Sequence, residues 1–184
     1  MLARQEGSRL ARLTKRQKGR YVRPHSTELR APRSAEEWSR YHDTRKRCIF
    51  EKYNGRESGY YFEYNPAHPD ERDPAHHPMV FLLEGQVIGT IRIDIKQDGR
   101  AIFRLVAIDT PWQGQGLGSV MLDLAENYAR ACGAHTVCLN SVPEAYCFYS
   151  RHGFSPARWE GCTHNRTEIP VAKALQPQPA LLAA

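Results

Sequence analysis

The sequence contains no long hydrophobic run. The longest apolar stretch in the body of the chain, 79–83, has five residues, whereas a membrane-spanning helix needs about 20. The first residues also lack the apolar segment of a secretory signal. These absences predict a protein that neither crosses a membrane nor is exported, and that acts in the cytoplasm.

Cysteine is sparse and irregularly spaced. The five cysteines are odd in number and contain no C-x-x-C pair, which favours reduced thiols over a disulfide framework. The proline-dense segment 65–78 contains three histidines and three acids, but without a recurrent metal-ligand spacing. Cys162 and His164 are too few ligands for zinc. We therefore expect no metal site.

A net positive charge is absent from the body of the chain. The net charge is 26 − 20 = +6, but residues 1–33 hold ten basic and two acidic side chains, a net +8. The remaining 151 residues hold 16 basic and 18 acidic side chains, a net −2. We expect a basic flexible tail over 1–33, one domain over 34–175 and a flexible tail over 176–184. Nucleic-acid binding is unlikely except through the basic tail.

The first half of this domain predicts a helix followed by three strands. Ser34 and Glu37 form a capping-box pattern that begins a helix, which should end near Tyr53. Residues 54–78 are rich in proline and glycine and predict an irregular segment. Strands are expected over 79–84, 86–95 and 101–109, joined as an antiparallel meander. In the second strand, Arg92 and Asp94 alternate with isoleucines, which is typical of a half-buried strand.

The second half predicts alternating helices and strands. An amphipathic helix over 119–132 ends at Gly133, and a strand over 135–140 follows it. Pro143 begins a helix over 143–152, and 167–175 predicts a last strand. A strand–helix–strand sequence implies a parallel strand pair with a crossover helix. The fold class is therefore α/β, in a mixed (α+β) arrangement.

A glycine-rich turn separates the third strand from the next helix. Its residues, Gln113–Gly118, combine close backbone approach with a helix N-terminus, which favours phosphate binding. No lysine follows Gly118, which excludes a P-loop. Ser119 occupies the third glycine position of a dinucleotide fingerprint, which excludes that motif too. The alternative to phosphate binding is that the turn is only a tight connection between the strand and the helix.

Two segments resemble motifs of the GNAT superfamily of acetyl-CoA-dependent N-acetyltransferases. RLVAIDTPWQGQGLGSVML is similar to its acetyl-CoA-binding motif, with Gln113, Gly116 and Gly118 at the signature positions. LNSVPEAYCFYSRHGF is similar to its second motif, with matches at Asn140, Ala145, Phe148, Tyr149, Gly153 and Phe154. The resemblance implies a mostly antiparallel mixed sheet that contains a central splayed parallel strand pair and is flanked by helices.

The resemblance also implies where acetyl-CoA binds as acyl donor. Backbone groups of Val106, Ala107 and Ile108 would pair with the pantetheine arm, and the amides of the glycine turn would bind the pyrophosphate. Asn140 would contact the pantetheine region, or instead cap the helix that follows it. The expected binding residues are Val106, Ala107, Ile108, Gln113, Gly114, Gln115, Gly116, Leu117, Gly118, Ser119, Asn140 and Tyr149.

Tyr149 is the expected catalytic residue. Its hydroxyl can donate a proton to the thiolate that leaves when an amine attacks the thioester. Tyr146, one turn earlier, could be confused with it. The Phe-Tyr pair before Gly-Phe favours Tyr149. The structural alternative is an aromatic side chain that only packs.

The general base stays open at this point. Relatives place a glutamate on the strand before the turn, but this strand has no carboxylate at 102–105. Glu84, Asp94 and His68 are candidates, and a chain of water molecules is an equal alternative. Direct transfer in a ternary complex is expected, since Cys147, a candidate acyl carrier, has no identified base partner.

The acceptor side is expected to come from the first helix and the loop after it. The residues predicted to border it are Arg45, Phe50, Glu51, Tyr60, Tyr61 and Tyr64. Acidic residues within 63–73 would suit a cationic amine. The expected activity is acetyl transfer to a primary amine of a small molecule or protein. A larger acyl group and a non-catalytic acyl-CoA-binding regulator are the alternatives, and a homodimer is compatible with the family.

Overall fold

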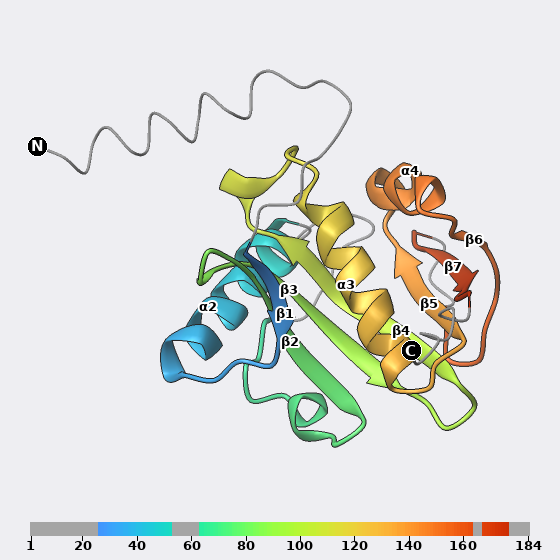
Figure 1. Cartoon of the computed structure of the whole chain (residues 1–184), viewed down its shortest axis with the longest axis horizontal. Helices are drawn as coiled ribbons and strands as arrows, with labels where there is room; N and C mark the ends of the chain where they lie inside the picture. The colour runs from blue at the N-terminus through green and yellow to red at the C-terminus, as the bar shows by residue number, and fades with distance from the viewer. Residues whose placement is uncertain (1–25, 53–62, 164–166, 177–184) are drawn as a thin grey trace, which may run out of the picture.

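A computed structural model gives the fold of residues 26–52, 63–163 and 167–176 (Figure 1). The strands form one seven-stranded sheet in the order β1-β2-β3-β4-β5-β7-β6. Their bounds are β1 Thr27–Arg30, β2 His76–Leu83, β3 Gln86–Ile95, β4 Arg100–Ile108, β5 Thr136–Ser141, β6 Ser155–Pro156 and β7 Ile169–Ala174. The fold is thus mixed α/β, as the sequence predicts.

In the described part of the chain, three α-helices and three short helices accompany the sheet. They are α2 Ala35–Arg45, the π-helix η1 Lys46–Glu51, the 3₁₀ helices η2 Pro69–Arg72 and η3 Thr110–Trp112, α3 Leu117–Ala131 and α4 Pro143–Arg151. The predicted cap is present, because Ser34 Oγ accepts from the Glu37 amide at 3.1 Å. Within the described ranges, no helix has the length and apolarity that a bilayer crossing requires.

The predicted meander and parallel pair are both confirmed. Strands β2, β3 and β4 pair antiparallel in succession. Strand β4 then pairs parallel with β5, after the crossover through α3. Gly133 and Gly153 end the two helices with φ of 86° and 85°, a backbone conformation that glycine adopts without steric cost.

The N-terminal boundary needs a correction. Thr27–Arg30 lies within the predicted tail, yet it forms β1 and pairs antiparallel with β2 from Thr27↔Leu83 to Arg30↔Val80. The Arg30 guanidinium also binds the Glu37 carboxylate at 2.7 Å, which fixes this edge strand to α2. Four largely polar residues carry no alternation, so tertiary pairing is what makes them a strand. The rest of the predicted tails, 1–25 and 177–184, lies outside the described residues.

Alternate side chains of the sheet face two different helical layers. On β2, Phe81 packs with Val120 and Met121 of α3, whereas Val80 and Leu82 pack with Tyr41 of α2. Figure 1 shows α3 crossing one face of the sheet. The core therefore has two layers, and the sheet separates α3 from α2.

Strand β3 is buried on both faces, which corrects the half-buried expectation. Ile91 and Ile93 pack toward α3, and on the opposite face Arg92 and Asp94 are only 5% and 1% exposed. Their charges are buried because Arg92 Nε donates to Asp94 Oδ1 at 2.8 Å. The alternation of polar and apolar residues in β3 therefore corresponds to two buried faces, one apolar and one with paired charges.

Gly89 permits β3 to lie close to β4. A Cβ at Gly89 would lie 2.9 Å from both the Ala107 carbonyl oxygen and Ile108 Cδ1. Gly89→Ala should lower the free energy of unfolding by about 1–3 kcal/mol through overpacking, measured by urea denaturation. Gly118→Ala is the control, since its Cβ would make only ordinary contacts, with Phe148 at 3.5 Å and Ile108 Cγ1 at 3.9 Å. Equal stability of the Gly89→Ala and parent proteins would contradict this prediction.

Candidate active site

Strands β4 and β5 separate after a short stretch of pairing. Their parallel ladder contains only three residue pairs, from Arg100↔Thr136 to Ile102↔Cys138. Beyond it, β5 continues to pair with β7, while 103–108 of β4 has no described strand on its β5 side. A cleft of about 1350 Å³ opens at this separation. The free backbone edge of β4 is therefore available to a ligand with amide groups.

A β-bulge changes the direction of β4 inside the cleft. Thr90 pairs with Ala107, but Arg92 pairs with Arg104, so β4 carries one extra residue at this point. Leu105 has a φ of 52°, which is uncommon for a leucine. The bulge directs Leu105 and Ala107 toward Cys48 and Ile49 of η1. The bulge thus lies between Arg104 and the segment 106–108 of β4.

The glycine turn presents a row of free amides to the cleft. Gly114 and Gly116 have φ of 75° and 80°, and α3 begins directly after Gly116. Within the described residues, nothing accepts a hydrogen bond from the backbone N–H groups of 114–118. Together with the positive end of the α3 dipole, these donors have the arrangement that suits a phosphate group.

Side chains of the turn stabilise its shape. Gln113 Nε2 donates to the Ile108 carbonyl at 2.7 Å, and Gln115 Nε2 donates to the Pro111 carbonyl at 3.1 Å. Asp109 accepts from the Thr110 amide and from Arg47 Nη1, both at 2.8 Å. The two glutamine side chains are therefore occupied, and their backbone amides are the groups that remain for an anion.

The cleft wall contains ten of the twelve predicted binding residues. They are Val106, Ala107, Ile108, Gln113, Gly114, Gly116, Gly118, Ser119, Asn140 and Tyr149. Leu117 is instead buried in the core between α3 and the sheet. Gln115 is also absent from the wall, although its amide belongs to the row of free donors.

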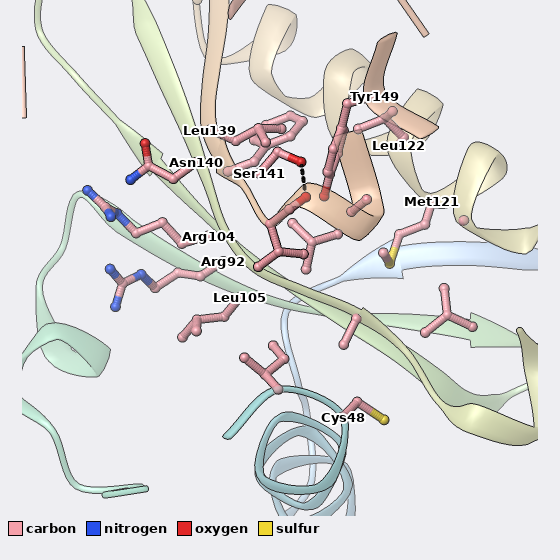
Figure 2. Close-up of a pocket in the computed structure, with 18 of the residues that line it drawn as sticks. Cys48, Arg92, Arg104, Leu105, Met121, Leu122, Leu139, Asn140, Ser141 and Tyr149 are labelled. Carbon is pink, nitrogen blue, oxygen red and sulfur yellow. Dashed lines mark hydrogen bonds between the residues drawn. The ribbon is translucent and has the colours of Figure 1, made fainter. Parts of the chain in front are cut away.

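Tyr149 extends from α4 into the gap between β4 and β5. Its ring packs edge-on against Phe148 and Phe154, and the residue is only 7% exposed. Figure 2 shows its hydroxyl directed toward the cleft between the separated strands. Tyr146 and the exposed Cys147 do not line the cleft. The structure thus distinguishes Tyr149 from both of these neighbours.

Asn140 lies at the end of β5, on the cleft wall. Helix α4 has Val142 at its N-cap and no side-chain cap, so Asn140 is not the helix cap. Its Oδ1 accepts a long hydrogen bond, 3.4 Å, from the Thr163 amide. Ser141 Oγ donates to the Val142 carbonyl at 2.9 Å, the dashed line in Figure 2. The Asn140 amide nitrogen is thereby left toward the cleft.

A serine–histidine pair joins α3 to α4 and was not anticipated from the sequence. His152 Nδ1 lies 2.8 Å from the Phe148 carbonyl, and Nε2 lies 2.9 Å from Ser119 Oγ. A carbonyl only accepts, so Nδ1 carries the hydrogen and Nε2 accepts from the Ser119 hydroxyl when the ring is neutral. Both residues line the cleft next to the free amides.

The opposite side of the cleft is rich in paired charges. Arg45 Nη1 donates to Glu71 Oε1 at 2.6 Å, and the Tyr41 hydroxyl donates to Oε2 at 3.0 Å. Burial opposes ionisation of Glu71, but the Arg45 guanidinium outweighs it, so the pKa of Glu71 lies below its ordinary value of 4.5. Burial also raises the pKa of Tyr41. Glu71 is therefore an anion held within the protein.

Asp94 is the centre of a second cluster on the same side. Its Oδ1 accepts from Arg92 Nε and its Oδ2 from Arg104 Nε, both at 2.8 Å. His76 Nε2 lies 3.5 Å from Oδ2. Arg92 and Arg104 both line the cleft, and Figure 2 shows them projecting together. The sequence offered one signal for this cluster, the charged residues inside an otherwise apolar strand.

The three candidate bases have different surroundings. Glu84 lies in the exposed turn after β2 and does not line the cleft. Asp94 is buried among cations and is also absent from the wall. His68 lines the cleft, but its Nδ1 accepts from the Asp70 amide at 3.3 Å. Glu84 and Asp94 are therefore not on the cleft wall, and the His68 Nδ1 atom, which belongs to a wall residue, already accepts a hydrogen bond.

The predicted acceptor residues are only partly brought together. Phe50 and Tyr64 line the cleft, whereas Arg45 and Glu51 do not. Tyr60 and Tyr61 lie outside the described residues. The acids expected to attract a cationic amine are mostly occupied within the protein. Glu71 binds Arg45, and Asp70 lies 3.4 Å from Arg92.

Among the described residues, no group of three or more histidine, cysteine, aspartate or glutamate side chains is arranged to hold a metal ion. His164 lies outside those residues. A cleft between splayed strands, with free amides at one end and a buried tyrosine at its centre, defines the acyl-CoA-dependent acyltransferases as the class to consider. The sequence comparison is more specific. Residues 27–154 match the model of the Acetyltransferase (GNAT) family, and the chain belongs to this family.

Solved structures with the same fold include several acyltransferases. The ribosomal-protein-S18-alanine N-acetyltransferase of Escherichia coli aligns with a TM-score of 0.61 and 16% identity, covering 86% of this chain and 100% of that one. The PaiA N-acetyltransferase of Thermoplasma acidophilum, solved in complex with coenzyme A, aligns with a TM-score of 0.63 and 15% identity, covering 82% of this chain and 99% of that one. An acyl-CoA N-acyltransferase of Pseudomonas aeruginosa aligns with a TM-score of 0.61 and 17% identity, covering 81% of this chain and 100% of that one. At these identities the likeness establishes the fold.

Glu71 should control stability at acidic pH. Glu71→Gln leaves the buried Arg45 guanidinium without its counter-charge and should lower the free energy of unfolding by about 3–5 kcal/mol. Because the folded-state pKa of Glu71 is lowered, its contribution is present above pH 4.5 and is lost as the pH falls through the folded value. Urea denaturation between pH 3 and 7 measures both effects.

Glu63→Gln is the control for Glu71→Gln, since Glu63 is exposed and also lines the cleft. It should change the free energy of unfolding by no more than about 0.5 kcal/mol. Parallel pH profiles for the parent and Glu71→Gln proteins would contradict the prediction.

Proposed function

We propose that the protein is an N-acetyltransferase that moves the acetyl group of acetyl-CoA to a primary amine of a small molecule or protein. One observation carries the proposal: the free amides of 114–118, the open edge of β4 and the hydroxyl of Tyr149 meet in a single cleft. A phosphate site, an amide-pairing edge and a proton donor are the features that an acyl-CoA thioester needs.

In this proposal the residues of the cleft hold two parts of acetyl-CoA, its pyrophosphate and its pantetheine arm. The amides of 114–118 would bind its pyrophosphate, with the Ser119 hydroxyl beside them. The backbone of Val106, Ala107 and Ile108 would pair with its pantetheine amides, as an added strand would. The cleft volume of about 1350 Å³ exceeds the range of about 300–1,000 Å³ for ordinary ligand sites. Acetyl-CoA supplies an activated acyl group and a thiolate leaving group.

Tyr149 and the amine acceptor carry the chemistry in direct transfer. The Tyr149 hydroxyl donates a proton to the departing sulfur, which limits the charge that develops there. A route through an acylated Cys147 is disfavoured, because Cys147 is outside the cleft wall. We assign removal of the acceptor proton to water, because Glu84 and Asp94 lie away from the wall and His68 accepts from Asp70.

The cytoplasm is the proposed place of action. Cys48, Cys132, Cys138, Cys147 and Cys162 are all free thiols in the structure, which suits a reducing compartment. A longer acyl donor is the second candidate function, and the large cleft is the observation that favours it. A regulator that binds acyl-CoA without turnover has no further support beyond the missing strand carboxylate.

Acetyl-CoA should stabilise the folded protein. At 100 times its Kd, a ligand that binds only the folded state adds about 2.7 kcal/mol, which should raise the midpoint of heat denaturation by roughly 5–10 °C for a domain of this size. S-acetyl-N-acetylcysteamine, a thioester without nucleotide, is the control and should have little effect. No shift with acetyl-CoA but a shift with a longer acyl-CoA would favour the second candidate.

Tyr149→Phe should slow transfer while preserving binding. Loss of the hydroxyl should lower kcat by about 100-fold or more and change KM for acetyl-CoA by less than about three-fold, because the ring keeps its packing. Continuous detection of free CoA thiol with an accepted amine measures both values. Tyr146→Phe is the matched control and should retain parent kcat. Parent-like kcat in Tyr149→Phe would remove this residue from the mechanism.

A further inference from the structure

We propose that the acceptor is a small amine that also carries a carboxylate, of the amino-acid class, and that Arg104 binds this carboxylate. The inference rests on the proposed acetyltransferase function and names its substrate class. It depends on the cluster around Asp94, which neither the sequence motifs nor the family assigns to the acceptor.

Arg104 is held as a preorganised anion receptor. Its Nε donates to Asp94 Oδ2 at 2.8 Å, and Asp94 is itself buried. Among the described residues, no hydrogen bond or ion pair occupies either Nη atom of Arg104. The side chain is 35% exposed and lines the cleft. An arginine whose Nε is fixed presents its remaining N–H groups in a rigid fork, which matches a carboxylate.

The need of the buried Asp94 carboxylate for a cationic partner does not explain the presence of Arg104. Arg92 already donates to both oxygens of Asp94, at 2.8 Å from Nε and 3.2 Å from Nη2. Arg104 lies directly opposite Arg92 in the β3–β4 register, and like charges in such a pair are destabilising. Because Arg104 shares its partner Asp94 with Arg92, its Nη groups are left for a further anionic partner. A bound carboxylate supplies that partner.

The position of Arg104 relates the carboxylate to the reacting centre. Val106, the first residue of the proposed pantetheine edge, follows Arg104 by two residues on β4, with the bulge at Leu105 between them. Figure 2 shows Arg104 and Asn140 on one side of the Tyr149 hydroxyl. We therefore expect the carboxylate and the reacting amine to belong to one small molecule, as they do in an amino acid.

The rest of the wall suits the ammonium end of such a molecule. Glu63 and Glu168 line the same cleft as the cations Lys52, Arg92 and Arg151, so its wall carries charges of both signs. A zwitterion places its positive group toward the carboxylates and its negative group on the arginine. This division of charge distinguishes an amino acid from a simple polyamine.

The first arm of the test compares matched acceptors on the full-length protein. Free CoA release is measured with acetyl-CoA and a panel of L-amino acids, each beside its carboxamide and its decarboxylated amine. We expect kcat/KM to be at least about 10-fold higher for the carboxylate form of the preferred acceptor, as for a charged hydrogen-bonded pair.

The second arm uses Arg104→Gln, which keeps an N–H donor for Asp94 and leaves Arg92 in place. KM for the carboxylate form should rise by about 10- to 100-fold, while KM values for the decarboxylated amine and acetyl-CoA stay within about two-fold. Arg100→Gln is the matched control on the same strand, because Arg100 pairs with Asp98 and Glu160 and does not line the cleft. Arg104→Lys should rescue KM only in part, since it lacks the fork.

Each outcome separates the inference from the proposed function. Turnover of amines with no preference for the carboxylate form, or preference for a polypeptide amine, overturns the inference and leaves acetyl transfer intact. If no amine is acetylated, binding of an N-acetyl-amino acid is measured by calorimetry on the parent and Arg104→Gln proteins. Binding that depends on Arg104 supports the carboxylate site without catalysis, and binding that does not depend on it overturns the site.

Discussion

The separation of β4 from β5 is the constraint on which the rest of the structure depends. Backbone N–H and C=O groups in a protein interior need partners, and three residue pairs satisfy them only as far as Ile102↔Cys138. Beyond that point β5 uses β7, so the edge of β4 faces a cleft. The bulge at Leu105 and the turn at Gly114 and Gly116 continue this edge toward the N-terminus of α3. In the proposed function, strand edge and helix amides act as one extended binding surface.

The two sides of this cleft use opposite physical strategies. At the turn, binding capacity comes from backbone groups that the fold leaves without acceptors, and side chains such as Gln113 only maintain the shape. On the other side, charge is concentrated in Arg45, Glu71, Arg92 and Asp94, all nearly buried. Buried ion pairs seldom add net stability compared with apolar packing. Their retention beside the cleft is understandable if fixed charges there position a ligand.

Much of the fold was predictable because its signals are local. The capping serine at 34, the glycines that end α3 and α4, the apolar run of β2 and the alternation along β3 each act within a few residues of sequence. The cleft residues around Tyr149 could be found for the same reason, since both motifs are contiguous. Strand β1 was missed because Thr27–Arg30 carries no pattern of its own and is a strand only through pairing with β2. His152 was missed because its partner Ser119 is on another helix.

The sequence by itself determined where most of the chain turns, which segments other than β1 form the main helices and strands, and which contiguous motif carries the free amides of the turn. Those properties follow from φ preferences, hydrophobic period and helix ends, which depend on near neighbours. Tertiary structure alone decided that Arg92 and Asp94 are buried, that Glu71 serves Arg45, and that Arg104 faces the cleft with an anchored Nε. Charged side chains acquire their role from groups far away in the chain, because burial and pairing exist only after the sheet and helices have packed.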